Sequence, residues 1–160
     1  MKPYSESCEQ NKNPIIEVLK QYFHTVDSVL EIGSGTGQHA VYFAERLPHL
    51  TWHCSDQAEN LKGIEMWLED AAANNISGPV LLDVDQGEWP VENTAAIFSA
   101  NTVHIMSWQS VENMFAGIDK ILQPGGIFCL YGPFNYDGKF SSESNAHFDV
   151  WLTQRHPVSG

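Results

Sequence analysis

The sequence predicts an α/β fold in which a parallel sheet carries helices on both faces. Two observations support this prediction. Short apolar runs rich in strand formers alternate with longer stretches of helical periodicity, and a glycine-rich loop joins the first of these strands to a helix. The 160 residues, 42% hydrophobic and 18% charged, have the size and composition of a single globular domain covering residues 1–160.

The first helix is expected to begin at Asn13 and Pro14, because asparagine is a favoured N-cap and proline suits the first helical position. Apolar residues between Ile15 and Phe23 recur at helical spacing and give this helix one apolar face. The residues before it, 1–12, are polar and are expected to be irregular.

The remaining elements are predicted from the same periodicities and from the polar or turn residues that end them. Strands are expected at residues 27–32, 51–55, 80–82, 95–100 and 127–131. Helices are expected around the apolar residues of 40–47, 61–71, 111–122 and, in the tail, 141–155.

Charge and composition exclude several classes of function. Twenty acidic residues against eight basic ones give a net charge of −12, so no nucleic acid partner is expected. No apolar run is long enough to span a membrane, and the N-terminus lacks the apolar region of a signal peptide. Cys8, Cys54 and Cys129 are far apart and form no CxxC pair, which indicates a reduced, cytoplasmic location.

The strongest motif is the loop Glu31-Ile-Gly-Ser-Gly-Thr-Gly37, at the junction of the first strand and the next helix. Its glycines permit positive φ and let a ligand approach the backbone closely. Gln38 stands where the dinucleotide fingerprint G-x-G-x-x-G requires its third glycine, which disfavours a nicotinamide-dependent oxidoreductase. No Gly-Lys-Ser/Thr follows, so the phosphate-binding P-loop is absent from the sequence.

Polar residues end four of the predicted strands: Glu31, Asp56, Asp83 and Asn101. In an open parallel sheet, ligands bind beyond the carboxyl ends of the strands. These four residues are therefore expected to surround one binding site.

The loop resembles the E/D-x-G-x-G-x-G loop of class I S-adenosylmethionine-dependent methyltransferases, which have a Rossmann-like fold. Further segments resemble the DUF938 (methyltransferase-like 26) proteins within that class. These segments are SESCEQNKNPI (5–15), EIGSGTGQHAVYFA (31–44), LPHLTW (47–52), SANTVHIMSW (99–108), LYGPF (130–134) and FSSESNAHFDVWL (140–152).

The resemblance implies S-adenosylmethionine as the cofactor and a methyl acceptor that is a small molecule or a protein. Glu31 would favour the cationic cofactor, Asp56 would accept from its ribose hydroxyls, Asp83 would accept from the adenine amino group, and Val84 would lie against the ring. The full set of expected cofactor residues is Glu31, Gly33, Ser34, Gly35, Thr36, Gly37, Asp56, Asp83, Val84 and Asn101.

The candidate catalytic residues follow the fourth and fifth strands: Asn101, His104 and Tyr131. A histidine such as His104 can accept a proton near neutral pH, although a histidine packed under a loop and a tyrosine that merely ends a strand are the alternative interpretations. The histidines show no paired metal-ligand spacing such as HExxH, so no metal is assigned. Residues 9–13 are open to two interpretations, a lid over the cofactor or a polar tail with a helix cap.

One departure from the class concerns the C-terminus. Only 29 residues follow Tyr131, too few for the usual helix and antiparallel hairpin, so the chain is expected to lack that hairpin and to be truncated or naturally short. Strand five would then be an exposed edge available for a homodimer. The alternative function is a non-catalytic module that binds S-adenosylmethionine or S-adenosylhomocysteine.

Overall fold

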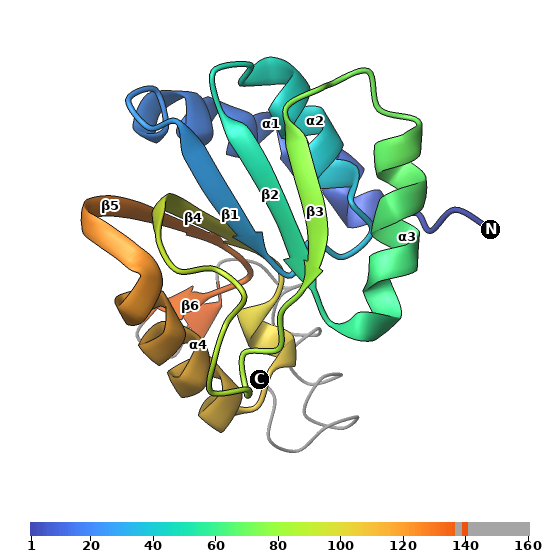
Figure 1. The fold of residues 1–160 in the computed structure, drawn as a ribbon. Helices are drawn as coiled ribbons and strands as arrows, with labels where there is room; N and C mark the ends of the chain where they lie inside the picture. Colours follow the sequence, from blue (N-terminus) through green and yellow to red (C-terminus); the bar gives the residue numbers. More distant parts are fainter. Residues whose placement is uncertain (137–138, 141–160) are drawn as a thin grey trace.

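The computed structural model describes residues 1–136 and 139–140 of the chain. Five parallel strands form the main sheet in the order β3-β2-β1-β4-β5 (Figure 1). Their bounds are Ser28–Ile32 (β1), Thr51–Asp56 (β2), Ile76–Leu81 (β3), Thr94–Ala100 (β4) and Leu122–Tyr131 (β5). The predicted parallel sheet is therefore confirmed.

Helices cover both faces of this sheet, as predicted. The first three helices, α1 (Glu6–Tyr22), α2 (Gln38–Arg46) and α3 (Ala58–Glu69), pack on one face in a core that includes Leu19, Phe43 and Trp52. Helix α4 (Trp108–Ile121) packs on the other face through Met114 and Ile118. A short 3₁₀ helix, η1 (Val103–Ile105), follows β4.

The start of the first helix was predicted wrongly. Residues 6–12 are helical rather than irregular, because Ser5 caps the helix by accepting from the Cys8 N–H. Pro14 lies inside α1 instead of opening it. Two strands also begin several residues earlier than predicted: β3 begins at Ile76 rather than at residue 80, and β5 begins at Leu122 rather than at residue 127.

The outer edge of β5 pairs with no strand among the described residues. Residues Asn135–Tyr136 (β6) and Lys139–Phe140 (β7) pair with each other in a separate two-stranded sheet. The expected helix over 141–155 lies outside the described residues. Within the part of the chain that the structure describes, no helix is long and apolar enough to cross a membrane.

The strand order places β1 between β2 and β4, so the chain leaves the carboxyl end of β1 on one side and later returns on the other. Such a reversal opens a crevice beyond the strand ends, where ligands bind in sheets of this kind. The fold thus positions the candidate site at the ends of β1, β2 and β4.

Candidate functional site

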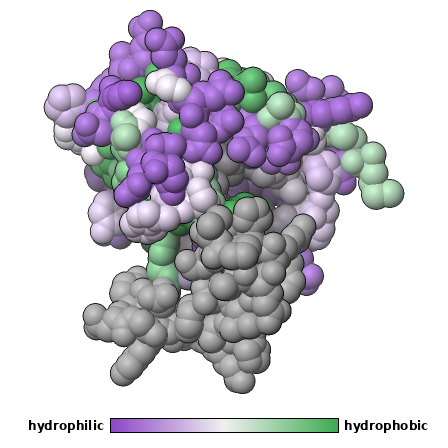
Figure 2. All heavy atoms as spheres, turned by 90° about the horizontal axis from the view of Figure 1, so that it is seen from below, coloured by the Kyte–Doolittle hydropathy of each residue, from purple (hydrophilic) through white to green (hydrophobic). Residues whose placement is uncertain are grey.

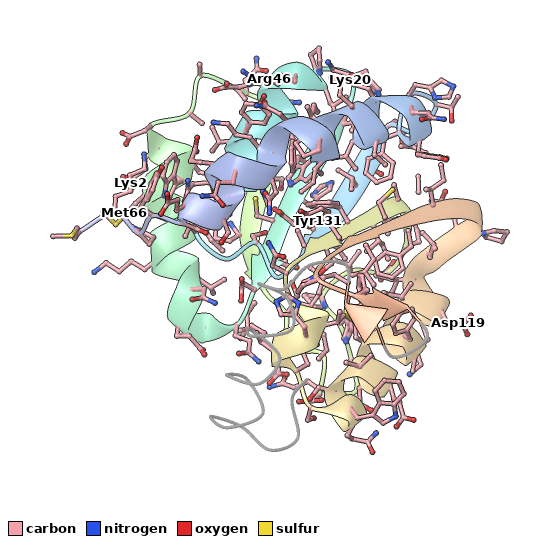
Figure 3. All side chains as sticks on the ribbon, turned by 180° about the vertical axis from the view of Figure 1, so that it is seen from behind. Lys2, Lys20, Arg46, Met66, Asp119 and Tyr131 are labelled. Atoms are coloured by element: carbon pink, nitrogen blue, oxygen red, sulfur yellow. The ribbon has the colours of Figure 1, made fainter. Side chains whose placement is uncertain are left out.

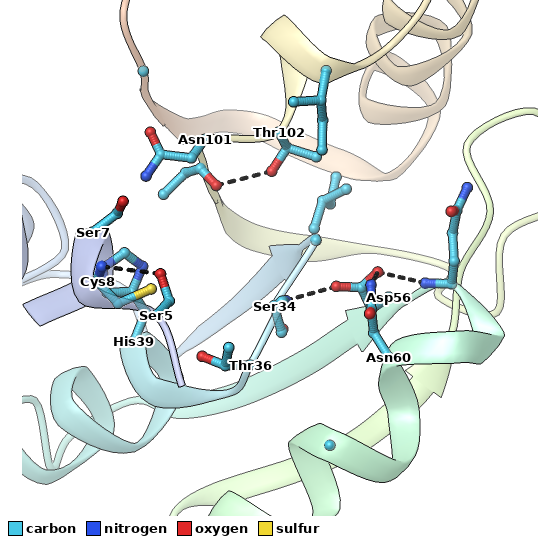
Figure 4. Close-up of a pocket in the computed structure, with 18 of the residues that line it drawn as sticks. Ser5, Ser7, Cys8, Ser34, Thr36, His39, Asp56, Asn60, Asn101 and Thr102 are labelled. Carbon is cyan, nitrogen blue, oxygen red and sulfur yellow. Dashed lines mark hydrogen bonds between the residues drawn. The ribbon is translucent and has the colours of Figure 1, made fainter. Parts of the chain in front are cut away.

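A cleft of about 1780 Å³ lies beyond the carboxyl ends of the strands. Figure 2 views the molecule from this side, where the described surface is largely hydrophilic. In the close-up, residues of α1 line one side of the cleft and residues of β2 and α3 line another (Figure 4). The glycine loop and the segment after β4 complete its lining.

Two glycines of the loop have different structural reasons to be glycine. Both adopt positive φ, +76° at Gly33 and +59° at Gly35. A Cβ at Gly33 would lie 2.8 Å from the side chain of Thr102, so the backbone and this side chain are in close contact. A Cβ at Gly35 would have no atom within 4 Å. Gly35 therefore keeps the cleft open where the loop backbone faces it.

Glu31 lies beneath this loop, fully buried at 1% exposure. Its Oε2 accepts from the Ser34 hydroxyl at 2.8 Å and from the Trp52 Nε1 at 3.0 Å. Burial, the largest effect, and the nearby charge of Asp56 together raise the pKa of Glu31 to about 7 against these two hydrogen bonds. Glu31 does not itself line the cleft, and neither do the predicted residues Gly37 and Asp83.

Asp56 ends β2 and lines the cleft, as the sequence predicts. Its Oδ2 accepts from the Gly35 N–H at 2.6 Å, and its Oδ1 accepts from the Gln57 N–H at 2.7 Å and from the Asn60 amide at 2.9 Å (Figure 4). This carboxylate thus fixes the loop, and a charge-assisted bond of this kind is a strong one.

Further residues that the sequence predicts to bind the cofactor follow β3 and β4. The part of the cleft lined by the predicted cofactor residues is called the cofactor half below. Val84 is buried and lines the cleft, whereas the Asp83 carboxylate accepts from the Asp85 N–H within its own loop. Asn101 lines the cleft in a left-handed conformation with φ +55°, and its N–H donates to the Tyr131 carbonyl at 2.9 Å. This bond joins the ends of β4 and β5.

The three candidate catalytic residues lie together in the described cleft. His104 lies in η1, and a Cβ at Gly132 would be 3.5 Å from its Nδ1. Tyr131, Asn101 and His104 all line the cleft. Burial lowers the pKa of His104, so its imidazole is neutral at physiological pH. A neutral imidazole beside a cleft can accept a proton.

Sequence reasoning missed the contribution of Gln38 and His39, which open α2. Both are buried, at 4% and 5% exposure, and both bind side chains of α1, Gln38 to Glu9 and His39 to Asn11. The only sequence signal was the presence of two polar side chains directly after the loop, at positions that a periodicity search treats as surface. No group of three or more potential metal-binding side chains occurs in residues 1–136 and 139–140.

The fold matches solved methyltransferase structures at low sequence identity. The apo S-adenosylmethionine-dependent methyltransferase SibL matches with a TM-score of 0.75 and 18% identity over 89% of this chain and 41% of that chain. PigF with SAH matches with a TM-score of 0.75 and 19% identity over 90% of this chain and 44% of that chain. Human N-acetylserotonin methyltransferase in complex with SAM matches with a TM-score of 0.77 and 12% identity over 92% of this chain and 41% of that chain.

The chain therefore spans less than half the length of these three proteins. One protein family also matches this chain: residues 2–160 fit the family described as "Protein of unknown function (DUF938)". This match covers almost the whole chain and includes the glycine loop, the end of β2 and the segment after β4. The chain belongs to the DUF938 family, on the Rossmann-like fold of class I S-adenosylmethionine-dependent methyltransferases.

Proposed function

We propose that this protein is an S-adenosylmethionine-dependent methyltransferase that acts on a small molecule or a protein rather than on nucleic acid. The observation that carries the proposal is the open glycine loop held by the Asp56 carboxylate at the edge of a large cleft. The matched methyltransferase folds support the same conclusion.

The charge of the cleft suits a cationic cofactor. Among the described lining residues the acidic side chains are Asp56, Glu59 and Asp85, and Lys62 is the only lysine or arginine. A pyrophosphate would meet net negative charge here, whereas a sulfonium and an ammonium group would be attracted. The open space at Gly35 gives such a ligand access to the loop backbone.

Each part of the cofactor half has a proposed role that follows from its chemistry. Asp56 offers carboxylate oxygens to ribose hydroxyls, in the way acidic residues at this place serve other nucleoside-binding folds. Val84 and Leu82, both buried and in the lining, offer an apolar wall to an adenine ring. When bound, S-adenosylmethionine supplies an activated methyl group and its own leaving group.

The residues at the other end of the cleft would serve the acceptor. His104 is neutral and lies in the lining, so it can take the proton from an acceptor hydroxyl or thiol as a general base. Asn101 and Tyr131 would position the acceptor. The apolar side chains of Ile105 and Met106 in the lining would contact the acceptor and help to hold it in line for the displacement.

The test is a calorimetric titration with S-adenosylmethionine and S-adenosylhomocysteine. Asp56→Ala should raise the dissociation constants of both ligands by about tenfold or more, as expected for the loss of a hydrogen-bonded carboxylate. Asp119→Ala is the matched control, because Asp119 is exposed on α4 and outside the cleft (Figure 3). Absence of binding by the wild-type protein would contradict the proposal.

Turnover separates the enzyme from a non-catalytic binding module. Methyl transfer to a panel of phenols, thiols and peptides should fall at least a hundredfold in His104→Ala, within the range for a lost general base. S-adenosylhomocysteine binding without any transfer would instead support the binding module.

We also propose that two copies pair through the outer edge of β5, which is ten residues long. Sedimentation velocity tests this assembly, and a monodisperse monomer at micromolar concentration would contradict it.

A further inference from the structure

The first turn of α2 fastens the N-terminal segment, defined here as residues 2–11, to the glycine loop. The Oε1 of Gln38 accepts from the Ser5 N–H at 2.5 Å and from the Thr36 hydroxyl at 3.0 Å. Its Nε2 donates to the Ser5 carbonyl at 3.3 Å and to Glu9 at 3.1 Å. All four hydrogen-bonding positions of this buried amide are therefore used.

His39 adds a second anchor one residue later. Its Nε2 lies 2.7 Å from the Oδ1 of Asn11, and both side chains are buried. The ring stacks on Phe43 at 5.0 Å, which fixes its orientation. Burial lowers the pKa of His39 to about 4, so the ring is neutral in this contact at physiological pH.

The same segment is held at its other end by α3. The Trp67 Nε1 donates to the Pro3 carbonyl at 2.6 Å, and the Lys2 ammonium lies 2.6 Å from Asp70 and 3.9 Å from the Trp67 ring centroid. A Cβ at Gly63 would lie 2.7 Å from Pro3, so the segment lies directly on α3. Figure 3 shows Lys2 beside α3, with α1 running across the neighbouring helices.

Held in this way, the segment forms a wall of the cleft. Ser5, Ser7 and Cys8 face the loop from one side, while Asp56 and Asn60 lie on the other (Figure 4). If the segment moved away, the cleft would lose this wall, and the Gln38 amide would lose its hydrogen bonds to Ser5 and Glu9. These contacts also account for the glutamine at the position where the dinucleotide fingerprint has glycine: the side chain is needed there as an anchor.

We propose that Gln38 and His39 are positioning residues that dock the N-terminal segment as a wall of the cofactor half, so that docking and cofactor binding stabilise each other. This inference rests on the proposed cofactor. The coupling follows because a ligand that binds only the docked state has its apparent affinity reduced by the docked fraction. By linkage, the ligand in turn raises the docked fraction.

The experiment combines amide hydrogen exchange by NMR with S-adenosylhomocysteine titration. Gln38→Ala is compared with Gln109→Ala, an exposed helical glutamine on α4 that lies outside the cleft. The Ser5 and Cys8 amides report docking directly, because their hydrogen bonds lie in the anchored turn. The Gly33 amide, which donates to the Ser55 carbonyl, reports whether the carboxyl ends of β1 and β2 remain paired.

In Gln38→Ala we expect exchange at Ser5 and Cys8 to accelerate at least tenfold, with exchange at Gly33 unchanged, and the dissociation constant of S-adenosylhomocysteine to rise about tenfold. In the wild-type protein, S-adenosylhomocysteine should slow exchange at Ser5 and Cys8. Faster exchange with an unchanged dissociation constant would overturn the coupling while leaving the proposed cofactor intact. No binding by the wild-type protein would overturn both.

A pair of variants keeps the inference testable if Gln38→Ala fails to fold. Gln38→Glu still accepts from the Ser5 N–H but loses its donor and faces Glu9, so it should undock the segment. Adding Glu9→Gln restores a donor–acceptor pair between the two positions and should recover part of both the protection and the affinity. A double variant no better than Gln38→Glu alone would overturn the role assigned to this contact.

Discussion

Replacing Glu31 by glutamine should change the pH dependence of stability in a defined direction. The folded-state pKa of Glu31 is raised to about 7 from an ordinary 4.5, mainly by burial. Between these two values the folded protein holds a proton on Glu31 that the unfolded chain has lost. The contribution of Glu31 to stability is therefore fully present below pH 4.5, falls as the pH rises, and is lost above pH 7.

The size of this contribution follows from the two pKa values. At ~1.4 kcal/mol per pH unit, the interval from 4.5 to about 7 corresponds to about 3 kcal/mol. The amide introduced by Glu31→Gln never ionises, and its oxygen can still accept from Ser34 and Trp52. We therefore expect Glu31→Gln to exceed the wild type by less than about 1 kcal/mol at pH 5 and by up to about 3 kcal/mol at pH 8.

The assay is urea denaturation of both proteins at pH 5, 6, 7 and 8, read as the difference in free energy of unfolding. Taking the difference cancels other titrating groups, including His39. Glu17→Gln serves as the control, because Glu17 is exposed on α1 and its ion pair in the described part of the chain is with Lys20. A pH-independent loss of stability in Glu31→Gln would refute the reasoning, since it would mean that Ser34 and Trp52 outweigh burial and keep Glu31 ionised.

Two further predictions concern neighbouring residues. Burial lowers the folded-state pKa of His39 to about 4, so its contribution of about 3 kcal/mol to stability is present above pH 6.5 and is lost as the pH falls to 4. In His39→Leu the melting temperature should therefore fall less steeply between pH 6.5 and pH 4 than in the wild type. An unchanged decrease would contradict this prediction. Gly33→Ala should lower the free energy of unfolding by about 2 kcal/mol or more and Gly35→Ala by about 1 kcal/mol, because only a Cβ at Gly33 meets Thr102. Gly35→Ala should instead weaken S-adenosylhomocysteine binding. Equal free energies of unfolding in the two variants would contradict this difference.

The sheet and the strand ends could be predicted from sequence because short apolar runs rich in strand formers report burial directly. Asp56 and Asn101 lie at the ends of their strands and in the cleft, as expected. The start of β3 was missed because Gly78 and Pro79 weaken the strand pattern. Proline is tolerated in an edge strand, and β3 lies at the edge of the sheet.

The first turns of the N-terminal helix were missed for a different physical reason. Its first turns are polar because they bind polar atoms of α2, through Glu9 to Gln38 and Asn11 to His39. Such contacts join residues about 30 positions apart and leave no apolar periodicity along the chain. Local sequence patterns report what a segment buries in the core, and they do not report which distant amide it binds.

The position of Glu31 changes how its effect on the cleft should be understood. The sequence suggested a carboxylate beside the cofactor cation, whereas the structure places it beneath the loop and bound to Ser34. Glu31 and Asp56 hold two consecutive loop residues, Ser34 through its hydroxyl and Gly35 through its N–H. Two carboxylates this close repel each other, and burial keeps solvent from screening them.

A cation in the cleft would relieve this repulsion without touching Glu31, because an electrostatic field needs no direct contact. The buried Glu31 carboxylate, which lies beneath the loop backbone, would therefore contribute to the preference of the loop for a cationic ligand. An anionic ligand would add to the repulsion that the loop already contains. On this view the acidic residue before the first glycine acts on ligand charge through the field, and the open backbone at Gly35 determines where the ligand lies.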